Sequence, residues 1–447
     1  MAIDPLQRDI VITGAVYVDP AGPQRALDVI LHRGEVVAAL PRTRSEEAAA
    51  AARRPGAWHV EANGFFLAPG FTDLHAHLRD FDQEAKETIR SGADAAAAGG
   101  FTTVVAMANT SPPLDNVDAL LDFRSRAAGA AARVLPVAAV TRGLAGKELT
   151  PMEGLAEMGA VAFSDDGQNA YDLELATAAV KRAAKLDRPV LVHAQDETTC
   201  PDGQADPIVA RPARLTPWPC SAEVSAVDLA IEACRQGAGR VHIQHVSCAA
   251  AVERIAKARR AGLAVTAEVT PHHLALNADR VLRDGPDPMA KVSPPLRRES
   301  DREALVQALA DGVIDAIATD HAPHELSTKN GDFASASFGI SGLETALSLC
   351  LELVAHGELT LSRMVEALTA GPVRVLGPAA ALPEPALRLG TPADLVLFDT
   401  KGIWTVDAKD FLSRGKNTPL QGREVHGRVL LTVTGGRPVM SRWMAGG

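Results

Sequence analysis

Short apolar runs alternate with alanine-rich stretches of helical spacing from about residue 66 to residue 376. The runs are short enough to be buried strands. They read FFLAPGFTDLHAH, FTTVVAMAN, RVLPVAAVT, GAVAFSDD, RPVLVHAQD, RVHIQHVS, LAVTAEVTPHH and IDAIATDHAPH. Eight strand–helix units in roughly 300 residues predict a (β/α)8 TIM-like barrel. A doubly wound open sheet is the alternative, and the missing GxGxxG after the first run disfavours it.

The two ends of the chain have a different pattern. Both contain β-rich runs separated by glycine and proline, such as DIVITGAVYVD and GREVHGRVLLTVTGG. We expect these ends to form one small β-sandwich built from both termini. The predicted organisation is therefore a sandwich made of residues 1–65 and 377–447 around a barrel of residues 66–376.

Composition narrows the class of protein. The chain of 447 residues is 47% hydrophobic and carries a formal net charge of −10 without a basic block, which disfavours nucleic-acid binding. Its five cysteines form no CxxC pair, which fits a reducing cytosol. We find no signal-peptide pattern and no apolar run approaching the roughly 18 residues of a membrane span. These features predict a cytoplasmic protein.

Histidines, carboxylates and one asparagine gather where the apolar runs end. In a (β/α)8 barrel the carboxyl ends of all strands lie on one face, so side chains from distant runs meet there. The residues singled out at these ends are His75, His77, Asn109, Asp166, His193, His245 and Asp320. Imidazole and carboxylate groups bind zinc and related cations. The pattern therefore predicts a metal centre at that face.

The pair His75 and His77 in GFTDLHAHLRD begins this centre. Residues i and i+2 on a strand point to the same side, so both imidazoles can face the barrel axis. Alone, such a pair is equally compatible with two structural histidines, and the ligands at the other strand ends favour metal binding. His242 lies three residues before His245, so strand alternation turns it to the opposite side, and we interpret it as structural.

Two aspartates complete the predicted centre. Asp320, in ATDHAPH, can bind a cation and accept a proton. A pair of cations about 3.5–4 Å apart needs a bridging anion, and Asp166 in VAFSDDGQ is the candidate. On a regular strand Asp165 points away from it. Asp-Gly is also a turn signal, and such a turn can present Asp166 to the metals.

Polar residues beside the centre are candidates for substrate binding. Arg79 lies two residues beyond His77, so continued strand alternation should bring it to the same face. Its guanidinium fork can bind a carboxylate, and Asn109 can supply an amide donor and acceptor. His324 follows Asp320 by four residues. Residues 325–337, ELSTKNGDFASAS, are polar and helix-poor, and we interpret them as a mobile loop or lid over the mouth.

A set of motifs in a fixed order resembles the bacterial class I dihydroorotases of the amidohydrolase superfamily. The motifs are GFTDLHAHLRD, MANTSPP, FSDDG, HIQHVS, TPHHL, SPPLR, TDHAPH and FGISGLETAL, and the resemblance covers essentially the whole chain. It implies a metal-containing barrel with a β-sandwich made from both termini. The implied activity is the zinc-dependent, reversible hydrolysis of (S)-dihydroorotate to N-carbamoyl-L-aspartate, the third step of de novo pyrimidine biosynthesis.

The resemblance also implies roles for single residues. Up to two Zn²⁺ would be bound, one by His75, His77 and Asp320 and the other by His193 and His245, with Asp166 as the bridge. Asp320 would act as the general acid/base. The expected contacts to substrate, chiefly to its carboxylate and its ring amide, come from His77, Arg79, Asn109, Ser293, His324, Phe338 and Gly339. Ser293 stands where the family often has asparagine, and its side chain has a shorter reach.

The end of the fourth run discriminates between relatives. Hydantoinase, dihydropyrimidinase and allantoinase relatives use a carboxylated lysine there, whereas residues 160–166 contain no lysine. Another cyclic amidase therefore remains the less favoured alternative. A non-catalytic dihydroorotase-like subunit of aspartate transcarbamoylase is a further alternative, which the intact ligand positions disfavour. We expect a homo-oligomer, and an active enzyme could also associate with aspartate transcarbamoylase.

Overall fold

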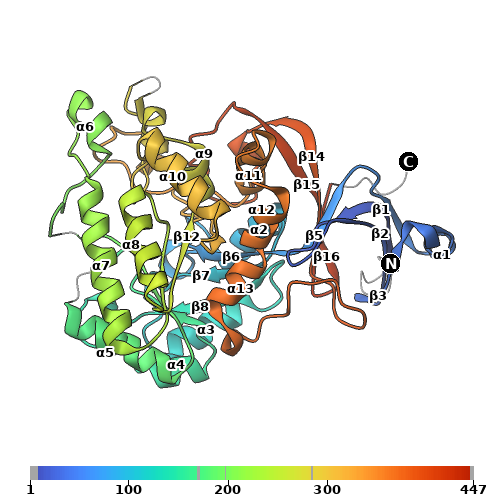
Figure 1. The fold of residues 1–447 in the computed structure, drawn as a ribbon, viewed down its shortest axis with the longest axis horizontal. Helices are drawn as coiled ribbons and strands as arrows, with labels where there is room; N and C mark the ends of the chain where they lie inside the picture. Colours follow the sequence, from blue (N-terminus) through green and yellow to red (C-terminus); the bar gives the residue numbers. More distant parts are fainter. Residues whose placement is uncertain (1–8, 169–171, 197, 283–284, 443–447) are drawn as a thin grey trace.

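A barrel of alternating strands and helices lies beside a separate mixed sheet in the computed structural model of this chain (Figure 1). The structure describes residues 9–168, 172–196, 198–282 and 285–442. Residues 1–8 and 443–447, the outer parts of the two predicted sandwich segments, lie outside the described residues. No helix in the described part of the chain is long and apolar enough to cross a membrane.

The barrel consists of eight parallel strands that pair in the order of the sequence. They are β6 (Phe71–Ala76), β7 (Phe101–Ala106), β8 (Arg133–Ala138), β9 (Ala162–Phe163), β10 (Val190–Val192), β11 (Val241–Ile243), β12 (Val265–Val269) and β13 (Ala316–Ile317). Buried apolar side chains such as Leu74, Val105 and Leu191 pack together between them. Each strand lies within one of the eight apolar runs, so the predicted (β/α)8 barrel is confirmed.

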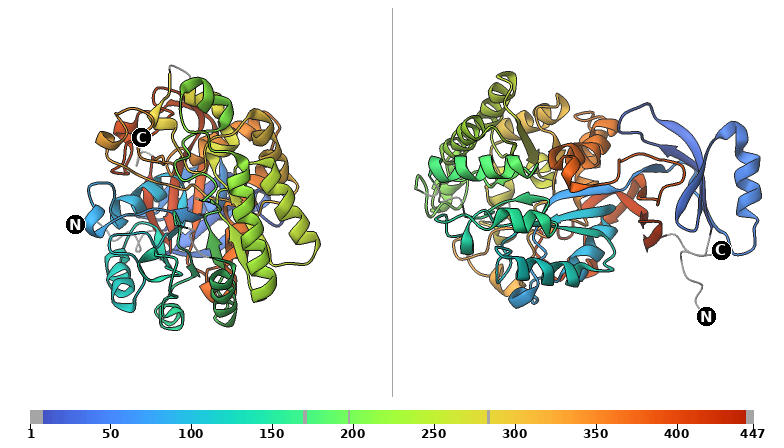
Figure 2. Two further views of the ribbon diagram at one scale, coloured as in Figure 1. Left: turned by 90° about the vertical axis from the view of Figure 1, so that its left-hand side faces the viewer. Right: turned by 90° about the horizontal axis from the view of Figure 1, so that it is seen from below.

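Helices surround the strands, as Figure 2 shows in its left-hand view. The helices after the first seven strands are α2 (Ile89–Ala98), α3 (Val117–Ala127), α4 (Met152–Glu157), α5 (Leu173–Lys185), α6 (Pro207–Ala213), α7 (Cys220–Gly237), α8 (Ala249–Arg260), α9 (Pro271–Ala275) and α10 (Glu299–Ala310). After β13 follow α11 (Ala346–Ala355), α12 (Leu361–Leu368) and α13 (Ala370–Leu376). Small alanines line the buried faces; in α5, Ala176, Ala179 and Ala183 are buried at helical spacing. Asp172 caps that helix by accepting a hydrogen bond from the backbone N–H of Leu175 at 2.9 Å.

The barrel closes at a seam where β13 meets β6. The buried carboxylate of Asp73 accepts hydrogen bonds from the backbone N–H of Thr319, at 2.8 Å, and from the Thr319 hydroxyl. Beyond the ends of both strands, the N–H of His77 donates to the carbonyl of His321 at 2.8 Å. The seam therefore sets Asp320 beside the histidines of the first barrel strand.

The mixed sheet joins strands from both ends of the chain, as the right-hand view of Figure 2 shows. Its order is β16–β15–β14–β5–β1–β2–β3, with β4 beside β1. The N-terminal strands are β1 (Ile10–Tyr17), β2 (Arg25–His32), β3 (Glu35–Pro41), β4 (Trp58–Glu61) and β5 (Phe66–Pro69), and α1 (Ser45–Ala52) packs on them. The C-terminal strands are β14 (Leu395–Thr405), β15 (Glu424–Thr434) and β16 (Arg437–Ser441). The prediction that both termini build one β module is confirmed.

The first apolar run is two strands rather than one. β5 pairs with β1 and β14 in the mixed sheet, whereas β6 begins the barrel one residue later. Gly70 separates them, and a Cβ atom there would meet the side chain of Thr102 at 2.2 Å. A single glycine thus lets the chain pass from sheet to barrel without interrupting the apolar pattern. The predicted domain limits at residues 65 and 376 stay predictions.

A segment between β14 and β15 returns to the barrel. We call residues 406–423 the C-terminal strap. Near its middle, the Ser413 hydroxyl donates to Glu87 at 2.5 Å and the backbone N–H of Arg414 donates to the same carboxylate at 3.1 Å. The part of the chain predicted to belong to the sandwich therefore also contacts the barrel at the carboxyl end of β6.

Replacing Asp73 tests the importance of the seam. We expect Asp73→Ala to lower the free energy of unfolding by about 2–4 kcal/mol, because two donors of Thr319 lose their buried acceptor. Asp73→Asn keeps one acceptor oxygen and should lose less. Urea unfolding of both variants measures this, with Glu303→Ala on the exposed face of α10 as a control expected to stay within about 0.5 kcal/mol. Equal stability of Asp73→Ala and the unchanged chain would contradict the role of the seam.

Candidate metal centre and active site

The six predicted metal ligands meet at the carboxyl ends of the barrel strands. His75 lies in β6, and each of the others follows the end of a strand by one to three residues. These residues are His77 after β6, Asp166 after β9, His193 after β10, His245 after β11 and Asp320 after β13. All six are buried. Five elements separated along the chain therefore bring imidazoles and carboxylates to one point.

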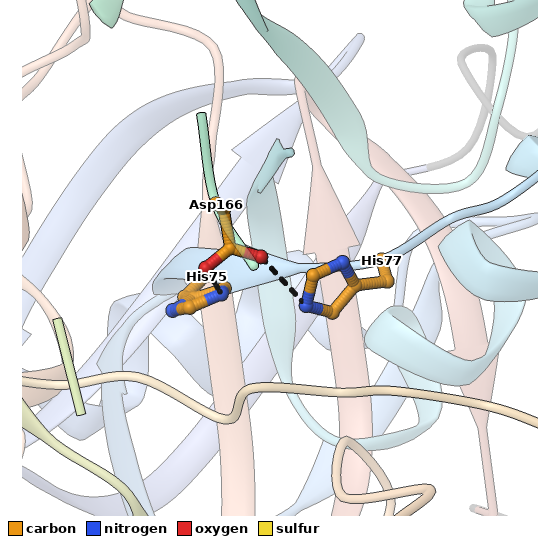
Figure 3. Close-up of side chains that lie close together, drawn as sticks. All are labelled: His75, His77 and Asp166. Carbon is orange, nitrogen blue, oxygen red and sulfur yellow. Dashed lines mark ion pairs between the residues drawn. The ribbon is translucent and has the colours of Figure 1, made fainter. Parts of the chain in front are cut away.

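The first group of ligands surrounds the carboxylate of Asp166. Figure 3 shows one oxygen of Asp166 turned toward His75 and the other toward His77. The Nε2 atoms of these histidines lie 3.5 and 3.4 Å from the respective oxygens, and 3.6 and 3.2 Å from Asp320 Oδ1. Two ligands about 2.0–2.2 Å from one tetrahedral zinc lie about 3.3–3.6 Å apart. The spacing therefore fits ligands of a shared cation.

A second group shares Asp166. Asp166, His193 and His245 offer ligand atoms within 4.8 Å of one another, as do His75, His77 and Asp166. His193 Nδ1 lies 3.4 Å from Asp166 Oδ1 and 2.7 Å from His245 Nε2. The second distance is that of a hydrogen bond, so these imidazoles would move apart slightly around a cation. The position of Asp166 in both groups is the geometry of a bridging ligand.

Acceptor oxygens orient three of the four imidazoles. Glu268 accepts from His75 Nδ1 at 2.9 Å, Asn109 from His77 Nδ1 at 2.9 Å, and Gln195 from His193 Nε2 at 2.8 Å. Each contact places the proton on the outer nitrogen and leaves the lone pair of the inner nitrogen facing the centre. The imidazoles are thus arranged as metal ligands.

The polar atoms at the centre lack partners of their own. His75 Nε2 and Asp166 Oδ1 are buried, and neither has a hydrogen-bond partner among the described residues. Such groups are costly unless something satisfies them. A cation bound by both atoms would do so, and the donor set of imidazoles and carboxylates suits zinc and similar divalent ions. The residues present therefore fit a metal centre.

Burial and neighbouring charges shift the pKa values of the ligands in the centre. Burial would raise the pKa of Asp166, but the nearby imidazoles of His75 and His193 outweigh it and hold that pKa well below its usual range. Burial would lower the pKa of His75, yet Asp166 and Asp320 raise it well above 6.5. Burial and repulsion from neighbouring histidines lower the pKa of His245. The carboxylates thus attract positive charge, which a cation can supply in place of a proton.

Three nearby residues have structural contacts instead. Asp165 accepts from the backbone N–H groups of Val140 and Thr141 at 2.7 and 3.0 Å, pointing away from the centre. His242 bonds Thr266 and the far oxygen of Glu268 at 2.9 and 3.0 Å, in agreement with its structural interpretation. His273 bonds Thr270 and the carbonyl of Pro294.

A cavity of about 360 Å³ lies above the centre. All predicted site residues except the more deeply buried His75 line it, together with Gln195 and Trp218. At one end stand Arg79 and His324, whose side chains approach to 3.4 Å. Arg79 Nε and His324 Nδ1 have no hydrogen-bond partner among the described residues. Burial lowers the pKa of Arg79 to about 10, so it stays charged at neutral pH, while burial and Arg79 lower that of His324 to about 3.

Some predicted substrate groups are already engaged. The Asn109 amide nitrogen lies 3.2 Å from both the carbonyl and the carboxylate of Asp166. The N–H of Gly339 donates to the carbonyl of Lys291 at 2.9 Å. Ser293 Oγ lies 3.4 Å from both His193 Nε2 and Gln195 Oε1. These groups fix the cavity wall as well as facing the cavity.

The loop after His324 packs against the chain around Phe338 and Gly339, which line the cavity. Within residues 325–337, Lys329, Phe333 and Ala336 are buried. The carbonyl of Phe338 accepts from His324 Nε2 at 2.8 Å, and the Phe338 ring packs edge-on against Trp218. The predicted place of this loop over the mouth and its predicted mobility stay predictions.

Sequence reasoning missed residues that act through the predicted ones. Glu268 is a carboxylate inside the buried strand β12, an unusual placement that could have drawn attention. Gln195 follows His193 by two residues and could have been found by the alternation used for His75 and His77. Asn417, whose contacts are described below, lies in the C-terminal strap and had no signal in the sequence.

Comparisons with known proteins agree with this geometry. A family model described as dihydro-orotase-like matches residues 64–228, and one described as amidohydrolase family matches residues 220–439. The dihydroorotase of Anaeromyxobacter dehalogenans strain 2CP-1 is 44% identical over 432 residues, covering 96% of this chain and 97% of that protein. The dihydroorotase of Shouchella clausii is 39% identical over 434 residues, covering 96% of this chain and 98% of the relative.

Solved structures give the same fold. The L-hydantoinase (dihydropyrimidinase) from Arthrobacter aurescens superposes with a TM-score of 0.85 at 26% identity, covering 98% of each chain. A D-hydantoinase from a Bacillus species, AR9, superposes with a TM-score of 0.79 at 26% identity, covering 97% of this chain and 95% of the other. The sequence identity to the two dihydroorotases, 44% and 39% over 96% of this chain, is higher than the 26% identity to these hydantoinases. It shows that the chain belongs to the dihydroorotase family of the amidohydrolase superfamily.

Proposed function

We propose that this chain is a dihydroorotase that hydrolyses the cyclic amide of (S)-dihydroorotate to N-carbamoyl-L-aspartate and also catalyses the reverse ring closure. The observation that carries the proposal is the carboxylate of Asp166, which lies between two groups of imidazoles beneath the cavity. Relatives at 39–44% identity over 96% of the chain bear the name dihydroorotase. Site and relatives thus support the same reaction.

The metal assignment follows the geometry of the two groups. His75, His77 and Asp320 would hold one Zn²⁺, and His193 and His245 a second, with Asp166 between them. When bound there, a divalent cation polarises an amide carbonyl and lowers the pKa of water toward neutrality. The absence of a lysine at residues 160–166 predicts that the site assembles without lysine carboxylation.

Asp320 is the group proposed to move the proton. Its Oδ1 lies 3.2 Å from His77 Nε2, at the floor of the cavity. As water adds to the ring carbonyl carbon, Asp320 accepts the water proton, and it returns that proton to the ring nitrogen as the C–N bond breaks. The same carboxylate serves the reverse direction by taking the proton from the ureido nitrogen.

The cavity suggests how the substrate is oriented. Arg79, Asn109 and His324 surround the end proposed for the substrate carboxylate, where the unpartnered Nε–H of Arg79 supplies a charged donor. At the other wall, His77, Ser293 and the backbone of Phe338 and Gly339 would border the ring. The ring amide would then lie above Asp166 and Asp320.

A direct assay separates this proposal from the related cyclic amidases. The solved structures that share the fold include an L-hydantoinase and D-hydantoinases. Purified protein would be tested on dihydroorotate, hydantoin and allantoin, with zinc, cobalt and manganese measured in the same sample. Turnover of dihydroorotate above the other two supports the proposal, and preferential turnover of hydantoin or allantoin contradicts it. Absence of both bound metal and turnover would favour a non-catalytic subunit.

The remaining expectations about partners stay predictions. A homo-oligomer is expected because most oligomers of soluble proteins consist of identical subunits, with dimers the commonest. Association with aspartate transcarbamoylase and a cytoplasmic location are likewise predicted from the sequence resemblance and composition. Size-exclusion chromatography of the protein alone and with that enzyme would test the first two.

Replacing Asp320 tests the proton transfer. We expect Asp320→Asn to keep the metals, because the amide oxygen can still be a ligand, while kcat falls by about 10²–10⁴-fold in both directions. Steady-state kinetics with metal analysis measures both quantities. A kcat near that of the unchanged enzyme would exclude Asp320 as the general acid/base.

Replacing Asp166 tests the bridge. We expect Asp166→Ala to lose bound metal as well as activity, because the residue contributes to both groups of ligands. Metal per subunit is measured on the purified variant after dialysis. Unchanged stoichiometry would count against a bridging role.

Replacing Glu268 tests the support of His75. Glu268→Gln keeps an acceptor oxygen for His75 but removes the buried charge, so we expect metal affinity to fall by about 10–100-fold. Competition with a chelator measures that affinity. Glu303→Ala, on the exposed face of α10, is the control. An equal affinity in the Glu268 variant and the unchanged protein would argue that Glu268 only fills space.

A further inference from the structure

The C-terminal strap inserts one fully buried amide beside the substrate cavity. Asn417 is 0% exposed. Its Oδ1 accepts from the backbone N–H of His324 at 2.8 Å, and its Nδ2 donates to the carbonyls of Ala322 and Gly339, each at 3.0 Å. Because a backbone N–H can only donate and carbonyls only accept, these contacts fix the orientation of the amide. One side chain thus holds both walls of the cavity.

The strap fits tightly at this point. Gly415 lies so close to the strand end that a Cβ atom would meet Pro323 Cβ at 2.4 Å and His324 N at 2.8 Å. The Ser341 hydroxyl donates to the carbonyl of Gly415 at 2.8 Å, and the backbone N–H of Ser341 donates to the Asn417 carbonyl at 2.8 Å. The strap therefore holds residues that border the cavity, rather than only covering the barrel.

A buried lysine holds the same carbonyl from the loop. Lys329 is 1% exposed. Its Nζ donates to the carbonyls of Ser337, Gly339 and Lys291 at 2.8, 3.0 and 3.2 Å. Within the described residues no carboxylate forms an ion pair with Lys329, so its three donors are directed to the backbone. Burying an ammonium group costs free energy. A buried lysine with these contacts therefore indicates that Lys329 contributes to the site.

The carbonyl of Gly339 is the meeting point of these contacts. It accepts from both Lys329 and Asn417, which uses both of its lone pairs. Gly339 has a φ of +121°, and a Cβ atom there would meet Ala322 Cβ at 2.5 Å, so its backbone is closely confined. The neighbouring carbonyl of Phe338 accepts from His324 Nε2 at 2.8 Å. Fixing Gly339 therefore also fixes the protonated nitrogen of His324.

We propose that Asn417 and Lys329 are positioning residues for the substrate, which set the separation between His324 and the wall formed by Phe338 and Gly339. The inference rests on the proposed dihydroorotase function, because it assigns these walls to substrate binding. Neither residue contacts the six metal ligands by a hydrogen bond or ion pair among the described residues. Their loss should weaken substrate binding and leave the metals in place.

Two substitutions test this role with a kinetic and a metal readout. Asn417→Asp keeps the acceptor for His324 and replaces the two N–H donors by an oxygen that faces two carbonyls. Lys329→Met removes three donors at similar length. For each holoenzyme variant we expect KM for dihydroorotate to rise about tenfold or more, kcat to change less than about threefold and metal per subunit to be unchanged. Lys409→Ala, exposed in the same strap, is the control with an unchanged KM.

Combining the two substitutions tests the shared carbonyl. Because both side chains act on Gly339, the double variant should raise KM by less than the product of the single effects. Binding of N-carbamoyl-L-aspartate, measured by calorimetry in the Asp320→Asn background, should weaken in parallel without depending on turnover. If Asn417→Asp does not yield folded protein, Lys329→Met carries the test by itself.

The outcomes separate this inference from the proposed function. An unchanged KM in active, metal-loaded variants overturns the inference alone. Loss of metal together with a fall in kcat at constant KM also overturns it, because that result indicates support of the metal centre. If the unchanged chain neither turns over dihydroorotate nor binds N-carbamoyl-L-aspartate, the proposed function fails and the inference with it.

Discussion

Closure of the barrel between β6 and β13 is the constraint on which the metal centre depends. His75 and His77 lie on one side of the seam and Asp320 on the other, so the distances between these ligands are set by strand pairing rather than by the ligands themselves. Asp73, which lies two residues before His75, links the two strands by accepting hydrogen bonds from Thr319. Hydrogen bonds of the scaffold thus position the first group of ligands. The ligand geometry can therefore be set before a cation binds.

The electrostatics of the centre follow from burying several carboxylates among imidazoles. Asp166 and Asp320 favour positive charge near His75, and Glu268 lies behind that histidine on the side away from the cavity. Glu268 also bonds His242, so it links a histidine outside the ligand set to His75. Burial would raise the pKa of Glu268, but the bonds from His242 and His75 outweigh it and lower that pKa to about 2, so Glu268 remains an anion. The chain therefore places carboxylates both at the centre and behind His75.

The barrel, the mixed sheet and the six candidate ligands could be predicted because each has a local signal. Apolar runs mark the strands, and a ligand at the end of a run is placed by topology alone. The position of Arg79 near the cavity could be predicted, but the reason for it could not. Its φ of +53° shows that a turn, and not continued strand alternation, directs the side chain there. The division at Gly70 left the apolar pattern unbroken, and Asn417 reaches the site only through tertiary contacts. Such features depend on long-range packing that no local pattern encodes.

Because strands from the two ends of the chain pair in one sheet, the order of translation affects how this protein folds. On the ribosome, β5 emerges early, yet its antiparallel partner β14 is made only after the whole barrel. Until then the nascent chain carries an open sheet edge, which is a site for aggregation or for chaperone binding. Asn417 is translated later still, so the walls of the cavity are held together only in the last stage of synthesis. The ligands come from earlier segments, and metal capture can therefore precede completion of the cavity.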